Sequence, residues 1–153
     1  TQSLYAHESV AYINLDFLFN NTIIGKKIIK KISTLDQQNI KQIKIEETKI
    51  KEKEKKLLNE KNLLSTEIFN QKLNNLKKEI KIFTSENIKN KKKIQEVKNK
   101  ELNEFLNKIQ PVLNNYMEKN SINILIDKKN IFIGKTELDI TEKIINIIDK
   151  DFK

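Results

Sequence analysis

Lysine is the residue type whose number and spacing in this chain could do the most chemistry. One lysine run contains Lys49, Lys51, Lys53, Lys55 and Lys56, interleaved with Glu52 and Glu54, and a second run without acids contains Lys89, Lys91, Lys92 and Lys93. A positive surface of this kind attracts acidic polypeptides, anionic lipid headgroups or nucleic acid. The alternative interpretation is a solvated helix surface with no dedicated partner.

The basic composition does not by itself favour nucleic acid. The net charge is +9, from 30 basic and 21 acidic residues, but every basic residue is lysine. Arginine normally supplies the forked contacts to phosphate and base edges, and aromatic residues supply stacking platforms. Neither pattern accompanies the lysine runs, so we expect no nucleic-acid partner. A bias toward codons for Lys, Asn and Ile would also produce part of this charge.

Residues that could support catalysis are few and scattered. His7 is the single histidine, and the chain has no cysteine, so a metal site or a thiolate nucleophile is not expected. Gly25 and Gly134 stand alone, whereas phosphate-binding loops need clustered glycines. Asp127 and Asp139 are interpreted as turn and cap residues. The sequence therefore predicts no enzyme, no catalytic residue, no metal and no cofactor.

An apolar stripe with steps of three and four residues dominates the second half of the chain. Its positions are Phe69, Leu73, Leu76, Ile80, Phe83, Asn87, Asn90, Ile94, Val97, Leu102, Phe105, Ile109, Val112 and Tyr116, with one slip of five after Val97. Asn87 and Asn90 are polar interruptions of this stripe. This spacing predicts a coiled-coil helix from about residue 66 to 119. Ile68 and Ile82 lie beside the stripe and are predicted to be exposed, and Pro111 is expected to kink the last turns.

A partner helix is predicted from Lys26 to about Lys61. Its stripe is strong at Ile28, Ile29, Ile32 and Leu35, continues through Ile40, Ile43, Ile50 and Leu57, and is diluted by Asp36, Glu47 and Glu54. We expect this helix to bend or splay in the middle, where apolar contact is thin. Residues 62 to 66 are the predicted reversal, with Ser65 or Thr66 as the cap of the return helix.

The two ends of the chain have a different character. Residues 10–15 predict a strand, Asp16 a helix cap, residues 17–19 a short helix, and Gly25 a bend. Residues 122–126 and 131–133 predict a β-hairpin around a polar turn. Asp139 and Glu142 resemble a capping box that opens a final helix lined by Ile140, Ile144, Ile147 and Ile148.

These elements predict an α+β fold. Strands from both chain ends form a small β body, residues 1–25 and 118–153, and a long α-helical coiled-coil hairpin, residues 26–117, projects from it. Three strands make a poor independent sheet, so an oligomer that shares one body is expected.

The order of elements and several short motifs resemble the Skp/OmpH family of periplasmic chaperones. The resemblance rests on the opening segment from Val10 to Phe19, with its Leu18–Phe19 pair, and on three closing segments, 122–127, 131–134 and 139–141. It extends over almost the whole chain, although the arms match only in length and character.

The resemblance implies a jellyfish-like homotrimer whose helical arms, or tentacles, enclose a cavity. Such chaperones hold unfolded outer-membrane proteins without ATP and are secreted into the periplasm by a cleaved signal peptide. The body residues implied are Val10, Ile13, Leu18, Phe19, Ile124, Ile126, Phe132, Asp139 and Thr141. Predicted client-contact residues are Ile68, Phe69, Ile82, Lys89, Lys91, Lys92 and Lys93. Anionic lipid or lipopolysaccharide is a further possible partner.

Two other classes of function stay open at this point. A nucleic-acid-binding coiled coil would use the lysine runs, and a purely structural stalk would use only the stripe. Light scattering of a diluted, unfolded outer-membrane protein separates the holdase from the stalk, because the stalk should not suppress aggregation.

Overall fold

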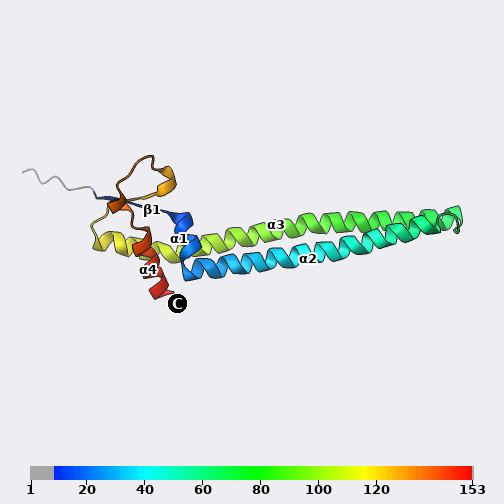
Figure 1. Cartoon of the computed structure of the whole chain (residues 1–153), viewed down its shortest axis with the longest axis horizontal. Helices are drawn as coiled ribbons and strands as arrows, with labels where there is room; N and C mark the ends of the chain where they lie inside the picture. Colours follow the sequence, from blue (N-terminus) through cyan, green and yellow to red (C-terminus); the bar gives the residue numbers. More distant parts are fainter. Residues whose placement is uncertain (1–8, 153) are drawn as a thin grey trace, which may run out of the picture. The chain divides into compact units, whose positions relative to one another are not determined.

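The computed structural model describes residues 9–152 and shows a chain of helices with one small sheet (Figure 1). Strand β1 (Val10–Ile13) precedes α1 (Leu15–Asn21), α2 (Ile23–Glu60) and α3 (Thr66–Lys119). Strand β2 (Ile124–Asp127), two short 3-10 turns (Lys128–Asn130 and Thr136–Leu138) and α4 (Thr141–Asp151) follow. The sequence interpretation of His7 lies outside the described residues.

The chain divides into two compact units. Of the described residues, the first unit, called the body unit, contains 9–31 and 99–152, and the second, called the arm unit, contains 32–98. Both long helices therefore contribute to both units. The predicted domain limits at residues 25 and 118 concern an oligomeric body, and they stay a prediction.

The sheet joins the two ends of the chain, as the sequence predicted. β1 and β2 pair in parallel, with Val10 opposite Ile124 and Ile13 opposite Asp127. Parallel neighbours need a long crossover connection, and the helical hairpin supplies it here. The fold class is therefore confirmed: a small sheet from both ends, with a long helical hairpin between its strands.

The predicted third strand at residues 131–133 is wrong for the single chain. Asp127 Oδ1 accepts a hydrogen bond from the Lys129 N–H at 3.2 Å and starts a 3-10 turn, after which residues 131–135 have no regular structure. Tyr12 of β1 instead bridges to Asp139, and its carbonyl accepts the Ile140 N–H at 3.0 Å. Local turn chemistry at Asp127 therefore ends the strand before a hairpin can form.

The body unit is held by a compact apolar core. Its buried members are Ala11, Ile13, Leu18, Phe105, Ile109, Ile140, Ile144 and Ile148. Ile144 and Ile148 are one helical turn apart in α4, and both are fully buried, as the predicted isoleucine face requires. The Phe19 ring meets Phe105 edge-on, with 4.9 Å between ring centroids. These contacts join segments from the beginning, middle and end of the sequence.

Three predicted caps and bends differ from the structure. Asn14, rather than Asp16, caps α1, and its side chain accepts the Phe17 N–H at 2.9 Å. Helix α4 begins at Thr141, whose N–H is accepted by Asp139 Oδ1, but the Glu142 side chain makes no return bond within the described residues, so the predicted capping box is incomplete. The bend lies at Thr22, and Gly25 is already helical in α2. A Cβ on Gly25 would lie 1.7 Å from the Phe19 carbonyl oxygen, so glycine is needed for close approach of the helices rather than for turning.

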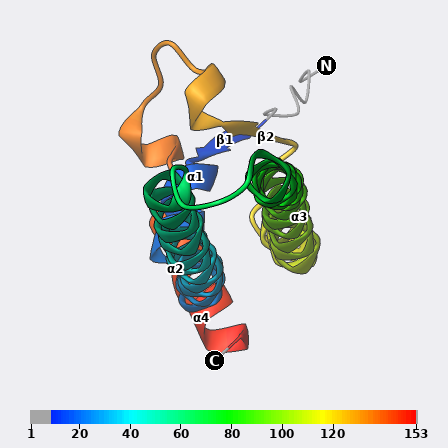
Figure 2. The same ribbon diagram turned by 90° about the vertical axis from the view of Figure 1, so that its right-hand side faces the viewer.

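The helical hairpin follows the sequence prediction closely. A short turn at residues 61–65 separates α2 from α3, and Ser65 Oγ accepts the Ile68 N–H at 3.3 Å. The two helices lie side by side in both views (Figure 1 and Figure 2). α3 is assigned as one helix through Pro111 to Lys119. α3 therefore begins and ends where the apolar stripe predicted, at residues 66 and 119.

The slip of five in the α3 stripe has a structural explanation. Leu102 is 44% exposed, so it does not belong to the seam. Glu101 takes the seam position instead, with its side chain 14% exposed and paired with Lys31. The spacing from Val97 through Glu101 to Phe105 is then two regular steps of four. One carboxylate therefore replaces an apolar residue without breaking the periodicity.

The α2 stripe also runs differently from the prediction. Ile40 is 52% exposed and Ile29 is 36% exposed, so neither belongs to the seam. Asn39 and Glu46 are half-buried there, while Glu47 and Glu54 are exposed. Polar residues thus occupy the seam itself in the middle of the arm unit.

Candidate functional site

A groove follows one side of the hairpin in the arm unit. Its tip section is lined by Lys53, Lys56, Leu57, Glu60, Lys72, Asn75, Leu76 and Glu79. Its middle section is lined by Asn39, Gln42, Ile43, Glu46, Ile50, Glu79, Ile82, Phe83, Glu86, Asn87 and Asn90. Glu79 lines both sections, so they are successive parts of one groove, which we call the arm groove.

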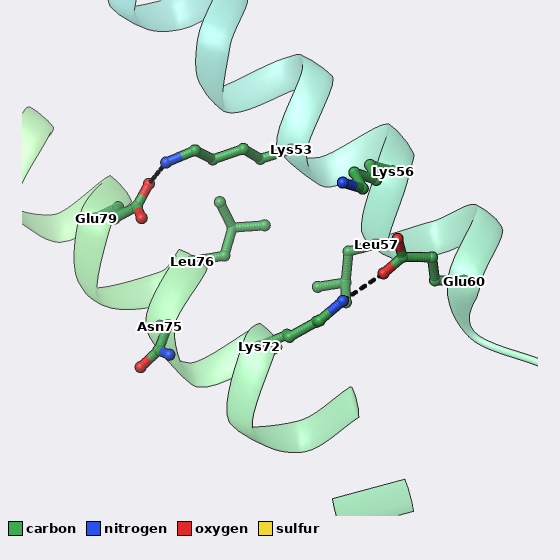
Figure 3. Close-up of a pocket in the computed structure, with 8 residues that line it drawn as sticks. All are labelled: Lys53, Lys56, Leu57, Glu60, Lys72, Asn75, Leu76 and Glu79. Carbon is green, nitrogen blue, oxygen red and sulfur yellow. Dashed lines mark hydrogen bonds and ion pairs between the residues drawn. The ribbon is translucent and has the colours of Figure 1, made fainter. Parts of the chain in front are cut away.

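The floor of the tip section is apolar. Leu57 of α2 and Leu76 of α3 are each 7% exposed, and they are the two buried hydrophobic residues among residues 32–98. Figure 3 shows both leucines between the helices, with polar side chains around them. Burial of one leucine is worth about 1.5–3 kcal/mol. These two residues therefore hold the helices together near the turn.

Two ion pairs connect the helices across the tip section (Figure 3). Lys53 Nζ lies 2.6 Å from Glu79 Oε2, and Lys72 Nζ lies 2.6 Å from Glu60 Oε2. The hydrogen bond from Lys72 holds the pKa of Glu60 below its ordinary value of 4.5. Solvent weakens ion pairs that are this exposed, so they orient the walls more than they stabilise them.

The middle section combines an apolar floor with amide groups. Ile43, Ile50 and Phe83 are half-buried on the floor, and Ile82 is 58% exposed at the side. Asn39, Asn87 and Asn90 add side-chain amides. The lining contains glutamates but no lysine. This section can therefore contact apolar side chains and hydrogen-bonding groups of a bound molecule without a cationic wall.

The structure places the predicted client-contact residues on different faces of α3. Ile82 lines the arm groove, and Ile68 is 46% exposed two heptads before it, on the same flank. Phe69 is half-buried in the seam. Lys89, Lys91, Lys92 and Lys93 are all exposed, and none of the four belongs to an ion pair within residues 9–152. The part that these residues play in binding stays a prediction.

Several exposed apolar residues of the arm were missed from the sequence. Leu58 is 73% exposed, Leu63 is 83% exposed, and Ile45 and Ile88 are 41% and 66% exposed. Leu58 directly follows the seam residue Leu57, so an adjacent apolar pair was the available signal. Successive helical residues point about 100° apart, so only one member of such a pair can enter a narrow seam.

The predicted body residues divide into buried and exposed groups. Ile13 and Leu18 belong to the core of the single chain, whereas Ile124 is 48% exposed and Phe132 is 98% exposed. Val10, Phe19 and Ile126 are half-buried. The exposed group is the one that could contact another copy of the chain, and its part in an oligomer stays a prediction.

A polar network joins the chain ends in the body unit. Thr141 Oγ1 accepts the Asn14 N–H at 2.9 Å, and Asp139 Oδ1 accepts the Thr141 N–H at 3.0 Å. Lys128 Nζ lies 3.0 Å from Asp139 Oδ2 and 5.7 Å from the centre of the Tyr12 ring. Burial opposes ionisation of Asp139, but the hydrogen bonds from Thr141 and Lys128 outweigh it and lower its pKa below 3.8. We interpret this network as structural.

No metal or membrane feature accompanies these sites in the part of the chain that the structure describes. Residues 9–152 contain no group of three His, Cys, Asp or Glu side chains that could hold a metal ion. Over the same residues, none of the helices combines the length and the apolar composition that crossing a membrane requires.

Comparison with known proteins relates the chain to one protein family and to a solved structure with the same fold. A family model described as outer membrane protein (OmpH-like) matches residues 9–148. The structure is similar to the crystal structure of a candidate outer membrane chaperone (OmpH-like) from Caulobacter crescentus CB15, with a TM-score of 0.88 and 16% identity. That alignment covers 97% of this chain and 88% of the other. No curated protein matches this chain.

Proposed function

Because the chain belongs to the OmpH-like family of outer membrane proteins, we propose that it is a chaperone that holds unfolded outer-membrane proteins without ATP. The bacterial protein with the same fold is described as a candidate outer membrane chaperone, which supports this class of function. The proposal places the protein in the periplasm, where such clients pass. Binding by the arms keeps clients apart and so prevents aggregation.

The observation that supports the proposal most is the exposed apolar surface of the arm unit. Seven large apolar side chains there are at least 41% exposed: Ile40, Ile45, Leu58, Leu63, Ile68, Ile82 and Ile88. They are scattered among lysines rather than gathered in one pocket. Each site offers only weak contact, but many weak contacts on one client add up to useful affinity. A holdase needs such contacts because it must also release its client.

The unpaired lysines 89–93 give the arm a second property that suits this function. A positive surface speeds the approach of acidic polypeptides, and salt screens it over about 8 Å at physiological ionic strength. Anionic lipid headgroups would be attracted in the same way. We therefore expect salt to slow client capture more than it weakens the complex once formed.

The proposed assembly is a homotrimer. In the single chain, Ile124 of β2 and Phe132 of the following loop expose large apolar surfaces. Contact with neighbouring copies would cover them, and three sheets of two strands would complete one shared β body. The arms of the three chains would then hold one client together.

The test is light scattering of an unfolded outer-membrane β-barrel protein diluted from urea, with and without this chain and with no nucleotide. We expect the chain to suppress the scattering in proportion to its concentration. Equal scattering in both samples would reject the holdase and favour a structural stalk. The same titration at rising salt should show slower capture while suppression at equilibrium persists.

A further inference from the structure

The middle section of the arm groove contains side-chain amides for which the hairpin itself provides no partner. Asn39 of α2 and Asn87 of α3 are half-buried there, and Asn90 is exposed beside them. Among residues 9–152, no hydrogen bond or other polar contact engages the side chains of these three residues. Each amide group therefore keeps one carbonyl acceptor and two N–H donors for another molecule.

A role in helix register does not explain these amides. Asparagine in a coiled-coil seam fixes register by pairing with polar groups across the seam, at a cost in stability. Asn39 and Asn87 do not pair in this way, although both occupy the seam region. Because they are only half-buried, their amide groups can reach solvent and can bond to a second molecule. Their place in the seam region is understandable if a ligand uses these hydrogen-bonding groups.

The surroundings of the amides match the groups of an extended polypeptide. A peptide main chain offers one N–H and one C=O per residue, which are the complements of a side-chain amide. An extended strand also directs alternate side chains to one face. Ile43, Ile50 and Phe83 provide an apolar floor for that face. Main-chain bonds then supply affinity for any sequence, and the floor selects alternating apolar residues.

The charges of this section argue against nucleic acid or lipid as its occupant. Its charged lining residues are Glu46, Glu79 and Glu86. Glu46 pairs with Lys49, and Glu79 pairs with Lys53, at 2.9 and 2.6 Å. Glu86 is the remaining charge and no lysine lines the section, so the lining offers a polyanion no cationic partner, whereas an uncharged extended polypeptide needs none. Binding here should therefore depend little on salt, unlike binding to the exposed lysines.

We propose that the middle section of the arm groove binds an extended polypeptide through its main chain. Asn39, Asn87 and Asn90 exchange hydrogen bonds with the peptide groups, and alternate apolar side chains contact the floor. The inference rests on the proposed function and defines its substrate class: unpaired strands with alternating apolar residues, before their main-chain groups are used in a sheet. In a folded β-barrel the strands are paired with one another, so no free main-chain groups are left for the groove and the client would be released.

The test begins with a fluorescein-labelled peptide of twelve residues that alternates valine and threonine between terminal lysines. A second peptide has the same side chains but carries N-methyl groups on its valines, which removes those N–H donors. We expect the full chain to bind the unmodified peptide at least about tenfold more tightly, since each lost hydrogen bond costs about 0.5–1.5 kcal/mol. The difference should persist at high salt.

The variant Asn39→Leu/Asn87→Leu removes two amides and adds apolar surface to the seam, so its hairpin should be at least as stable as the original. Asn74→Leu is the control, because Asn74 is exposed and does not line the groove. We expect the double variant to bind the unmodified peptide about tenfold more weakly and the control to bind it normally. Undiminished binding by the double variant would overturn the inference, because purely apolar recognition would tolerate leucine.

Failure of this inference differs from failure of the holdase proposal. If the unaltered chain suppresses aggregation but binds both peptides equally, or neither, main-chain recognition is rejected and the holdase survives. If the chain does not suppress aggregation at all, the holdase proposal is rejected. The comparison of the two peptides then still decides whether the groove binds the peptide main chain.

Discussion

At the scale of single residues, glycine at position 25 is required by geometry rather than by turn chemistry. The site of an added Cβ lies 1.7 Å from the Phe19 carbonyl oxygen and 2.8 Å from Thr22 Oγ1. The first of these atoms belongs to the backbone and cannot rotate away. A methyl group there would force α1 and α2 apart, and both helices belong to the body unit up to residue 31.

Gly25→Ala should therefore destabilise the protein by about 1–3 kcal/mol, the usual cost of overpacking, even though alanine is the better helix former. Urea unfolding followed by circular dichroism, at one fixed chain concentration, measures this change. Ser33→Ala is the matched control, since Ser33 is exposed on the same helix. Equal stability of both variants would show that the two helices can separate without cost.

Asp139 gives a pH-dependent prediction at the same scale. Its pKa is lowered in the folded chain, so the folded state favours the carboxylate. The stabilisation is fully present above the ordinary pKa of 3.8 and is lost as the pH falls through the lower folded value. Asp139→Asn should cost about 1 kcal/mol at neutral pH, and the difference from the original chain should shrink below pH 3.8. A difference that is constant with pH would assign the loss to shape rather than to charge.

At the scale of elements, two adjacent leucines near the end of α2 separate stability from binding. Leu57 is 7% exposed in the seam, and Leu58 is 73% exposed. Leu57→Ala should destabilise the arm by about 2 kcal/mol or more, because it removes one of two buried residues there. Leu58→Ala should leave stability unchanged within about 0.5 kcal/mol and weaken suppression of client aggregation.

Hydrogen exchange of the residues around the turn is the suitable measurement for this pair. It reports local opening of the arm, which a whole-chain unfolding curve would average with the body. Rapid exchange in Leu57→Ala but not in Leu58→Ala is the expected pattern. The opposite pattern would mean that the face of α2 directed to α3 is wrongly assigned.

Periodicity predicted the helices well because it reports which residues share a face. It located the ends of α3 and predicted the turn at residues 62–66, one residue later than the observed turn at 61–65. It could not decide between neighbours when both fitted one face. The apolar pattern predicts Leu102 in the seam, but Glu101 occupies it, and the pairing of Glu101 with Lys31 on α2 compensates for its burial. Such compensation depends on a residue 70 positions away, which local spacing does not reveal.

The arm groove was only partly predictable for the same reason. Ile82 was identified because it lies beside the stripe, but the amides of Asn87 and Asn90 were interpreted as interruptions. Their significance depends on Asn39, which reaches them only through the pairing of α2 with α3. At the ends of the chain, strand propensity located β1 and β2 within two residues but also suggested a strand at 131–133. The partner of those residues, if they have one, lies outside the single chain.

At the scale of the whole molecule, β2 and the loop that follows it leave apolar surface exposed in the single chain. Phe132 is 98% exposed, Ile133 is 84% exposed and Ile124 is 48% exposed. Adjacent large apolar residues as exposed as Phe132 and Ile133 are unusual in a monomer and are typical of protein interfaces. We therefore expect sedimentation velocity at micromolar concentration to give a mass near three times 18.1 kDa. A mass of one chain would contradict the shared body.

Ile124→Asp is the sharpest test of that assembly, because the same residue is exposed in one chain and would be buried among three. In the single chain an aspartate at this position stays in water, so the helices and the core around Ile144 should form normally. In the trimer it would place an unpaired charge in an apolar interface, which costs several kcal/mol and should dissociate the chains.

The control is Glu118→Asp, which keeps the charge of an exposed residue near the end of α3. A variant with normal circular dichroism and the mass of one chain is expected, and its loss of client protection would link assembly to function. If the variant remains trimeric, the interface between the chains does not include Ile124 of β2.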